Sequence, residues 1–284
     1  MALACLVWGM PFHIILLTLL AALMHASWNA LLRVGADRLW SMTIMCVAVA
    51  AASGVIAPFL GFPARASWFY AVLSAVLHVG YNLFLVRSYQ VGDLGQTYPI
   101  ARGSSPILVT IGASAFAGEA IAKSALLGIV LVSSGIISLA FKGRRPAVAG
   151  VPYALATGLF IAAYSVTDGI GVRLSGAPIA YTAWMSALWG VLMPLVYIAL
   201  RGTSGLLAVR PGFGKALIGG LVSLLAYGIV IYAMSDAPMG AVSALRETSV
   251  LFAAVIGYLF LGETFTFRKM LACTMIAAGA VMIG

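Results

Sequence analysis

Two arginines lie inside long apolar stretches of the sequence, where a charge is unfavourable. They are Arg102 and Arg246, and the other cationic residues fall between the predicted membrane spans or near their ends. A charge at the centre of a membrane helix costs about 2.5–3.5 kcal/mol on insertion scales, so it is retained where it faces a cavity or a partner. We predict that the two guanidinium groups bind a carboxylate or phosphate. The alternative is structural: Arg246 would pair with Glu247 or Asp168. Arg102 would then bond backbone carbonyl groups around Pro99.

Polar and aromatic side chains recur along several predicted spans at offsets of three, four and seven residues. Such offsets place them on one face of a helix, turned away from lipid. That face either lines a substrate cavity or makes interhelical hydrogen bonds, which contribute about 0.6 kcal/mol each. We expect the rings to hold an apolar or cationic part of a substrate by stacking or cation–π contact. The predicted substrate-binding residues, with the two arginines, are His25, Trp28, Asn29, His78, Tyr81, Tyr98, Arg102, Tyr164, Tyr227 and Arg246.

Few other titratable groups lie deep in the apolar stretches. Asp168 and Glu247 are the acids placed there, and both are candidates for coupling to protons. Alternatively, Glu247 neutralises its neighbour Arg246, and Asp168 lies at the membrane interface. His25 and His78 titrate near neutral pH, so they are either proton carriers or hydrogen-bonding core residues.

The sequence contains no recognisable metal or nucleotide motif. Its three cysteines, Cys5, Cys46 and Cys273, are far apart and form no CxxC or Cys/His spacing. There is no HExxH sequence and no phosphate-binding P-loop. We therefore expect no metal, no cofactor, no ATP-driven mechanism and no enzymatic activity.

The composition is that of an integral membrane protein. Of 284 residues, 63% are hydrophobic and 8% are charged, with a mean hydropathy of +1.10. A soluble domain has about 25% charged residues, so soluble and disordered proteins are both excluded. The net charge of +9 does not indicate nucleic-acid binding, because no basic run is longer than 142–145. The excess is explained by positive residues in cytoplasmic loops.

The apolar stretches predict ten membrane-spanning helices and an all-α fold. Their continuity excludes a membrane β-barrel, whose strands would alternate. The odd-numbered connections hold eleven cationic residues and the even-numbered ones hold three, which places the odd connections in the cytoplasm and both termini outside. The predicted spans are about 12–33, 39–60, 67–89, 95–117, 124–141, 149–172, 178–200, 214–235, 239–261 and 266–283.

The chain repeats itself at a shift of 144 residues. The shift aligns the two mid-span arginines and also Gly118-Glu119 with Gly262-Glu263. Between 102 and 135 there are seven identities in 34 positions without a gap. We predict two repeats of five spans, 1–142 and 147–284. Because five is odd, the second repeat must insert upside down relative to the first, as in many secondary transporters. We expect Glu119 and Glu263 to stabilise the N-terminus of the helix that follows each of them.

These residues resemble the drug/metabolite transporter superfamily, and within it the ten-span EamA-type permeases. The resemblance covers nearly the whole chain. It is carried by the duplicated Gly-Glu pair with a glycine sixteen residues after each glutamate, and by the segments 25–30 (HASWNA) and 98–103 (YPIARG). It implies a ten-helix protein with a central cavity lined mainly by spans 1, 3, 4, 6, 8 and 9. The second copy departs from the first at Ala272, which stands where the first has Gly128.

The expected function is secondary transport of a small amphipathic metabolite by alternating access between the two repeats. An amino acid fits both the arginines and the aromatic residues, and the family resemblance favours export. The serious alternative is a lipid or glycolipid flippase of the same fold; an intramembrane enzyme or a non-transporting scaffold fits less well. We expect a multi-pass protein of the bacterial inner (cytoplasmic) membrane, monomeric or homodimeric, with a small-molecule substrate and lipid as its partners and no nucleic acid.

Overall fold

The computed structural model describes residues 10–33, 37–92, 94–141, 148–207, 210–261 and 266–284. Over these ranges every regular element is a helix, which confirms the all-helical prediction. Residues 142–145, Gly262 and Glu263, which the sequence analysis singles out, lie outside the described residues. The elements are α1 (Phe12–Arg33), α2 (Arg38–Leu60), η1 (Arg65–Ser67), α3 (Trp68–Val91), α4 (Leu94–Ala117), α5 (Lys123–Ser138), η2 (Val148–Gly150), α6 (Val151–Ser175), α7 (Pro178–Arg201), α8 (Thr203–Leu207), α9 (Phe213–Asp236), α10 (Met239–Arg246), α11 (Ser249–Leu261) and α12 (Phe267–Ile283).

Six of the described segments are long and apolar enough to cross a membrane. They are α1, α2, η1 with α3, α6, α7 and α9. A helix satisfies its own backbone hydrogen bonds, which is why it is the form an apolar segment adopts in lipid. Large apolar side chains such as Phe59 (87% exposed) and Val281 (80% exposed) cover the outside of the bundle. The chain is therefore an integral, multi-pass membrane protein.

The predicted ninth span is interrupted. Helix α10 ends at Arg246 and α11 begins at Ser249, with a turn at Glu247 and Thr248 between them. The hydroxyl of Thr248 donates to the carbonyl oxygen of Leu245 at 2.6 Å and so caps the end of α10. The sequence gives no warning of this break, because neither Gly nor Pro stands there.

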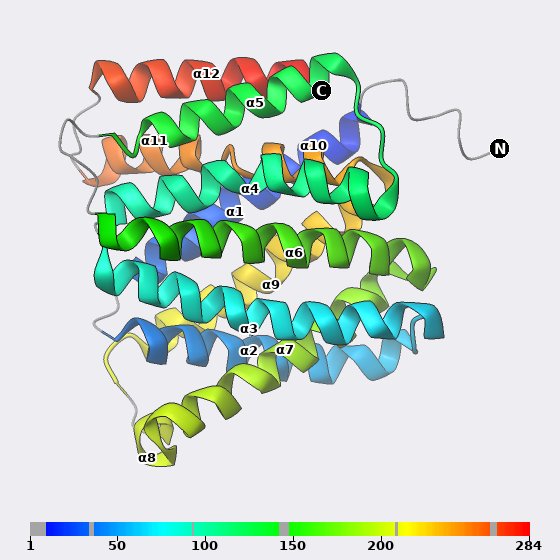
Figure 1. The fold of residues 1–284 in the computed structure, drawn as a ribbon. Helices are drawn as coiled ribbons and strands as arrows, with labels where there is room; N and C mark the ends of the chain where they lie inside the picture. Colours follow the sequence, from blue (N-terminus) through cyan, green and yellow to red (C-terminus); the bar gives the residue numbers. More distant parts are fainter. Residues whose placement is uncertain (1–9, 34–36, 93, 142–147, 208–209, 262–265) are drawn as a thin grey trace.

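The connections between helices gather at two opposite ends of the bundle (Figure 1). At one end, here called the odd end, Arg38 donates to the carbonyl oxygen of Tyr89 at 2.9 Å, which joins the first connection to the third. At the other, the even end, the amide of Ala64 donates to the carbonyl oxygen of Ser175 at 3.0 Å, which joins the second connection to the sixth. The odd end lies at the left of Figure 1, beside α8.

An acid at the odd end connects distant parts of the chain. Asp37 is the N-cap of α2 and accepts from the amide of Trp40 at 3.1 Å. The same carboxylate pairs with Arg201 at 2.6 Å and Arg210 at 2.7 Å. Partial burial alone would raise the pKa of Asp37, but the Trp40 hydrogen bond and the two guanidinium groups lower it below its ordinary value. Asp37 is therefore ionised at neutral pH and holds the start of α2 to the second half of the chain.

The most extensive helix contacts join the first half of the chain to the second. Helix α2 packs on α7, α3 on α6, α5 on α12 and α1 on α9. The contact between α5 and α12 depends on glycine: a β-carbon at Gly128 would lie 2.6 Å from the carbonyl oxygen of Gly279. Helix backbones approach this closely where residues are small. The halves are thus interleaved, and the space between them lies at the centre of the bundle.

Candidate functional site

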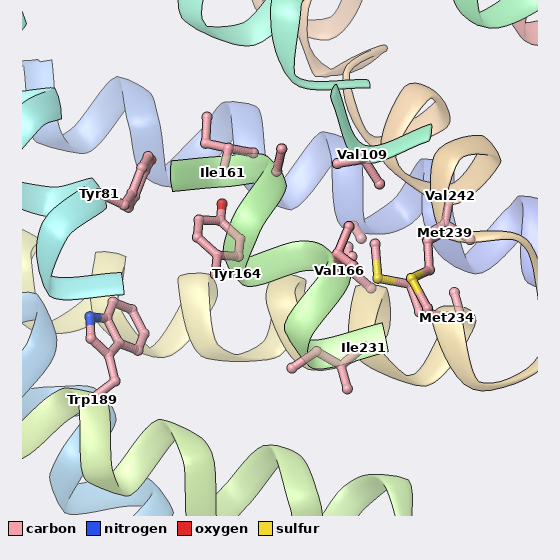
Figure 2. Close-up of a cluster of buried hydrophobic side chains, with 14 of the residues drawn as sticks. Tyr81, Val109, Ile161, Tyr164, Val166, Trp189, Ile231, Met234, Met239 and Val242 are labelled. Atoms are coloured by element: carbon pink, nitrogen blue, oxygen red, sulfur yellow. The ribbon is translucent and has the colours of Figure 1, made fainter. Parts of the chain in front are cut away.

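A buried cavity lies between the two halves of the chain. Its volume, taken as the space that the centre of a water molecule can occupy, is about 40 Å³. The cavity can therefore hold a few water molecules, since each needs roughly 10–15 Å³ on this measure. Figure 2 shows three of its wall residues, Tyr81, Tyr164 and Trp189, facing one another from different helices. The complete wall comprises His25, Trp28, Met42, Met45, Cys46, Val49, His78, Tyr81, Asn82, Tyr164, Trp189, Ser223, Tyr227 and Arg246.

An aromatic cluster forms one side of the cavity around His78. The imidazole stacks on the ring of Tyr164 with centroids 4.0 Å apart and lies 5.0 Å from Trp189 and 5.2 Å from Tyr227. Its Nδ1 lies 2.9 Å from the carbonyl oxygen of Ser74, a contact that needs a proton on that nitrogen. The rings therefore present a rigid, largely apolar surface to the cavity, suited to stacking or cation–π contact.

A second aromatic pair comes from α1. The indole N–H of Trp28 donates to Nδ1 of His25 at 3.1 Å, and the two rings meet edge to face. Because Nδ1 accepts this bond, the imidazole of His25 carries its proton on Nε2. Asn29 follows but turns away: its amide donates to the carbonyl oxygen of His25 at 2.9 Å, and it is not part of the cavity wall.

Two buried arginines share one buried glutamate beside the cavity. Nε of Arg102 lies 2.7 Å from Oε2 of Glu247, and Nη2 of Arg246 lies 3.3 Å from Oε1. The side chains are 3% exposed for Arg102, 2% for Arg246 and 0% for Glu247. Although Nε of Arg102 is close to Oε2, its N–H does not point at that oxygen, so the contact is ionic without being a hydrogen bond. Arg246 belongs to the wall, whereas Arg102 stands behind it with its guanidinium 5.9 Å from the ring centre of Tyr98.

Asp168 is also fully buried, but its carboxylate accepts hydrogen bonds from tyrosines and, among the described residues, does not pair with an arginine. It accepts from the hydroxyl of Tyr227 at 2.6 Å and from that of Tyr181 at 3.0 Å. Two donated hydrogen bonds are what an ionised carboxylate requires in a buried place. The Tyr227 hydroxyl thereby links this acid to the cavity wall.

The even side of the cavity is closed by an apolar cluster that includes Val166, Met234, Met239 and Val242. Figure 2 shows these side chains together on the far side of Tyr164 from Tyr81. They come from α6, α9 and α10 and are at most 7% exposed. By contrast, Met42 and Met45 lie near the start of α2, at the odd end. The cavity therefore sits between the middle of the bundle and the odd end.

A half-buried ion pair lies beyond this cluster at the even end. Glu119 pairs with Arg173 at 2.5 Å and accepts from the amide of Met239 at 3.0 Å. Arg173 also donates to the carbonyl oxygens of Met234 and Ala237, at 2.9 and 2.8 Å. We expected Glu119 to stabilise the helix that follows it; instead, its carboxylate lies at the N-terminus of α10. The difference arises because α10 packs on α4, which brings the first residue of α10 to Glu119.

The structure brings seven of the ten predicted substrate-binding residues to the cavity wall. Asn29, Tyr98 and Arg102 lie outside it. The wall also has residues absent from the prediction: Asn82, Trp189, Ser223 and four from α2. In the part of the chain that the structure describes, no group of three or more His, Cys, Asp or Glu side chains is placed to hold a metal.

Comparison with known proteins gives a shared fold for the whole chain and a family for its second half. No curated protein sequence matches the chain. One solved structure, described only as the crystal structure of a protein, matches with a TM-score of 0.75 over 95% of this chain and 94% of its own, at 18% identity; such a likeness shows a shared fold. Residues 148–284 match the model of the EamA-like transporter family. The family expected from the sequence, the EamA-like transporter family, is thus confirmed over residues 148–284, the second half of the chain.

Proposed function

We propose that the protein is a secondary transporter, working as an exporter, of a small amphipathic metabolite such as an amino acid. The proposal rests chiefly on one observation: Arg246 is the permanently charged side chain in the described wall of a buried, otherwise aromatic and apolar cavity. A guanidinium group binds a carboxylate with charge-assisted, often bidentate hydrogen bonds. The ring faces of Tyr164, Trp189 and Tyr227 suit the remainder of such a molecule.

Ten membrane crossings are part of the proposal. Six described segments meet the length and hydropathy of a span. Alongside them, α4, α5, α12 and the broken pair α10–α11 run along the same bundle (Figure 1). The helix break at Glu247 and Thr248 fits this function, because transporters commonly build their binding sites at discontinuous helices near the midplane. Arg246 is the last residue before the break.

Exchange symmetry between the halves supports two inverted repeats. Gly128 packs on Gly279, and Gly135 packs on Ala272. The 144-residue shift relates Gly128 to Ala272 and Gly135 to Gly279, so exchanging the repeats turns each contact into the other. Position numbers rise along α5 and fall along α12, so the helices are antiparallel. A two-fold axis that exchanges them is perpendicular to both, and in a membrane such an axis lies in the plane of the bilayer.

Two further pairs of helix contacts follow the same rule. If α1, α2 and α3 correspond to α6, α7 and α9, then the contact of α3 with α6 corresponds to that of α9 with α1. The contact of α2 with α9 likewise corresponds to that of α7 with α3. Two similar units of opposite polarity give inward-open and outward-open states of similar energy, which is the basis of alternating access.

The cavity favours a water-soluble substrate over a lipid. Its wall residues are buried or half-buried, with none of them exposed to the side of the bundle. A flippase needs a polar groove that opens sideways into the bilayer. We propose that the odd end faces the cytoplasm, which the positive excess of the odd connections supports, and that the protein lies in the bacterial inner membrane.

A reconstituted system tests the function directly. Proteoliposomes are loaded with labelled phenylalanine, leucine and glutamate, which differ in the side chain beyond a common carboxylate, and release is measured. We expect Arg246→Gln to reduce release at least tenfold, since a lost charged hydrogen bond is worth about 1.5–3 kcal/mol. Arg87→Gln is the matched control, because Arg87 is exposed and hydrogen-bonds Gln90. Equal release by both variants would remove Arg246 from the site.

Substrate binding can also be measured without transport. Cys46 lines the cavity and is 1% exposed. A bound substrate should slow its modification by a small maleimide in detergent solution, while Cys273 on α12 should react at an unchanged rate. If none of the three amino acids protects Cys46 or moves across the membrane, the proposed substrate class is wrong.

A further inference from the structure

The three charged side chains that contact one another beside the cavity do not balance in charge. Arg102 and Arg246 bring two positive charges, and Glu247 supplies one negative charge to both. The other buried acid nearby, Asp168, accepts from two tyrosine hydroxyls and makes no ion pair with either arginine in the described structure. The group of three therefore has one positive charge in excess.

Both arginines keep hydrogen-bond donors that have no acceptor. Nε and Nη2 of Arg102 and Nε of Arg246 are buried and have no hydrogen-bond acceptor. Arg246 reaches the cavity, where a few water molecules can solvate it. A buried guanidinium without a full counter-charge is strongly unfavourable once that water is removed.

We propose that this excess charge makes the protein an exchanger, in which the cavity closes readily around a bound carboxylate and only slowly when it is empty. The proposal rests on the proposed transport function. In alternating access the cavity must close to one side before it opens to the other. The empty site would then enclose Arg246 with only a share of the Glu247 counter-charge, whereas a substrate carboxylate supplies the missing negative charge.

Arg102 controls this property without touching the cavity. Its Nε lies 2.7 Å from one oxygen of Glu247 while Arg246 donates a hydrogen bond to the other oxygen at 3.3 Å, so a single carboxylate is shared between the two arginines. Without Arg102, Glu247 and Arg246 would form a neutral pair and the empty site could close. Arg102 is thus a positioning residue that keeps Arg246 short of counter-charge and ready for a substrate.

Counterflow measures the effect. Proteoliposomes are loaded with labelled phenylalanine, leucine or glutamate and diluted into buffer with or without the same unlabelled amino acid. We expect release from wild type to be about tenfold faster, or more, with external amino acid present, because the return step then occurs with the site filled. For Arg102→Gln the ratio should fall close to one, with faster release into plain buffer than wild type shows.

A charge-matched double variant separates electrostatics from damage to the fold. Arg102→Gln with Glu247→Gln leaves Arg246 as the one unpaired charge, so the stimulation by external substrate should return. Equal wild-type rates with and without external substrate would overturn the exchange proposal while leaving transport established. An unchanged ratio in a monodisperse Arg102→Gln, or no recovery in the double variant, would overturn the charge mechanism. Absence of release under both conditions would instead count against the proposed function.

Discussion

Replacement of Glu119 by glutamine should make the even end of the bundle open more often. The Glu119 carboxylate pairs with Arg173 at 2.5 Å and accepts from the amide of Met239 at 3.0 and 3.3 Å through its two oxygens. Glutamine keeps one oxygen for that amide but loses the negative charge. Because Glu119 belongs to the first half of the chain and Arg173 to the second, the charge pair holds the halves together where alternating access requires them to separate.

The size of the effect follows from burial. The Glu119 side chain is 4% exposed and that of Arg173 is 31% exposed. A hydrogen bond to a charged group contributes about 1.5–3 kcal/mol, and the partial exposure of Arg173 reduces this to about 1–2 kcal/mol. Such a change should raise the population of the state open at the even end by about 5-fold to 30-fold.

A cysteine in the apolar cluster reports the opening. Val109 is 0% exposed and labelled in Figure 2. In a background with Cys5, Cys46 and Cys273 replaced by serine, Val109→Cys should react slowly with a membrane-impermeant thiol reagent added at the even side. Where opening is rare, the rate is proportional to the open population, so Glu119→Gln should raise it 5-fold to 30-fold.

The control is an acid at the same end with no partner in the other half. Asp236 is exposed and contacts its neighbour Ser235, so Asp236→Asn changes the local charge without touching the Glu119 pair. It should leave the labelling rate unchanged. If Glu119→Gln labels no faster than Asp236→Asn, the pair does not hold the even end closed, and our account of this end is wrong.

Two further predictions concern packing and coupling. Gly279→Ala should lower the melting temperature in detergent by several degrees, since its β-carbon would lie 2.6 Å from the Gly128 carbonyl oxygen and overpacking costs about 1–3 kcal/mol; Gly54→Ala, with open space around it, should not. Asp168 remains our candidate coupling carboxylate because the hydroxyl of Tyr227 joins it to the cavity. An imposed pH gradient should therefore change release by wild type and not by Asp168→Asn, and a wild type insensitive to the gradient would exclude that role.

The features predicted best from sequence are those in which a residue that is energetically unfavourable in the membrane is nevertheless present. Arg102 and Arg246 were recognised because charge in an apolar stretch needs a compensating partner, and both are buried at an ion pair with Glu247. The sequence is consistent both with binding of a substrate by these arginines and with a structural ion pair. Their environments differ for a reason that the sequence does not contain: the break after α10 turns Arg246 toward the cavity, while the uninterrupted α4 keeps Arg102 behind it.

The contribution of α2 to the cavity could not be predicted from residue type. Its four wall residues have the spacing of one helical face, yet three of them are aliphatic or thioether side chains and the other is a thiol, as expected for any packed helix. Only the packing of α2 on α7 and α9 makes that face part of a cavity. The four are Met42, Met45, Cys46 and Val49.

The two ends of the bundle are held across the halves by ion pairs of unequal strength. At the odd end, Asp37 meets Arg201 and Arg210, whose side chains are 39% and 36% exposed. Exposed pairs contribute about 0–1 kcal/mol each. The pair at the even end includes the buried Glu119 and is reinforced by the apolar cluster beneath it. The odd end should therefore open first, which agrees with a cavity displaced toward it. If that end faces the cytoplasm, as we propose from the positive excess of the odd connections, the empty site loads from inside the cell, in agreement with the proposed export.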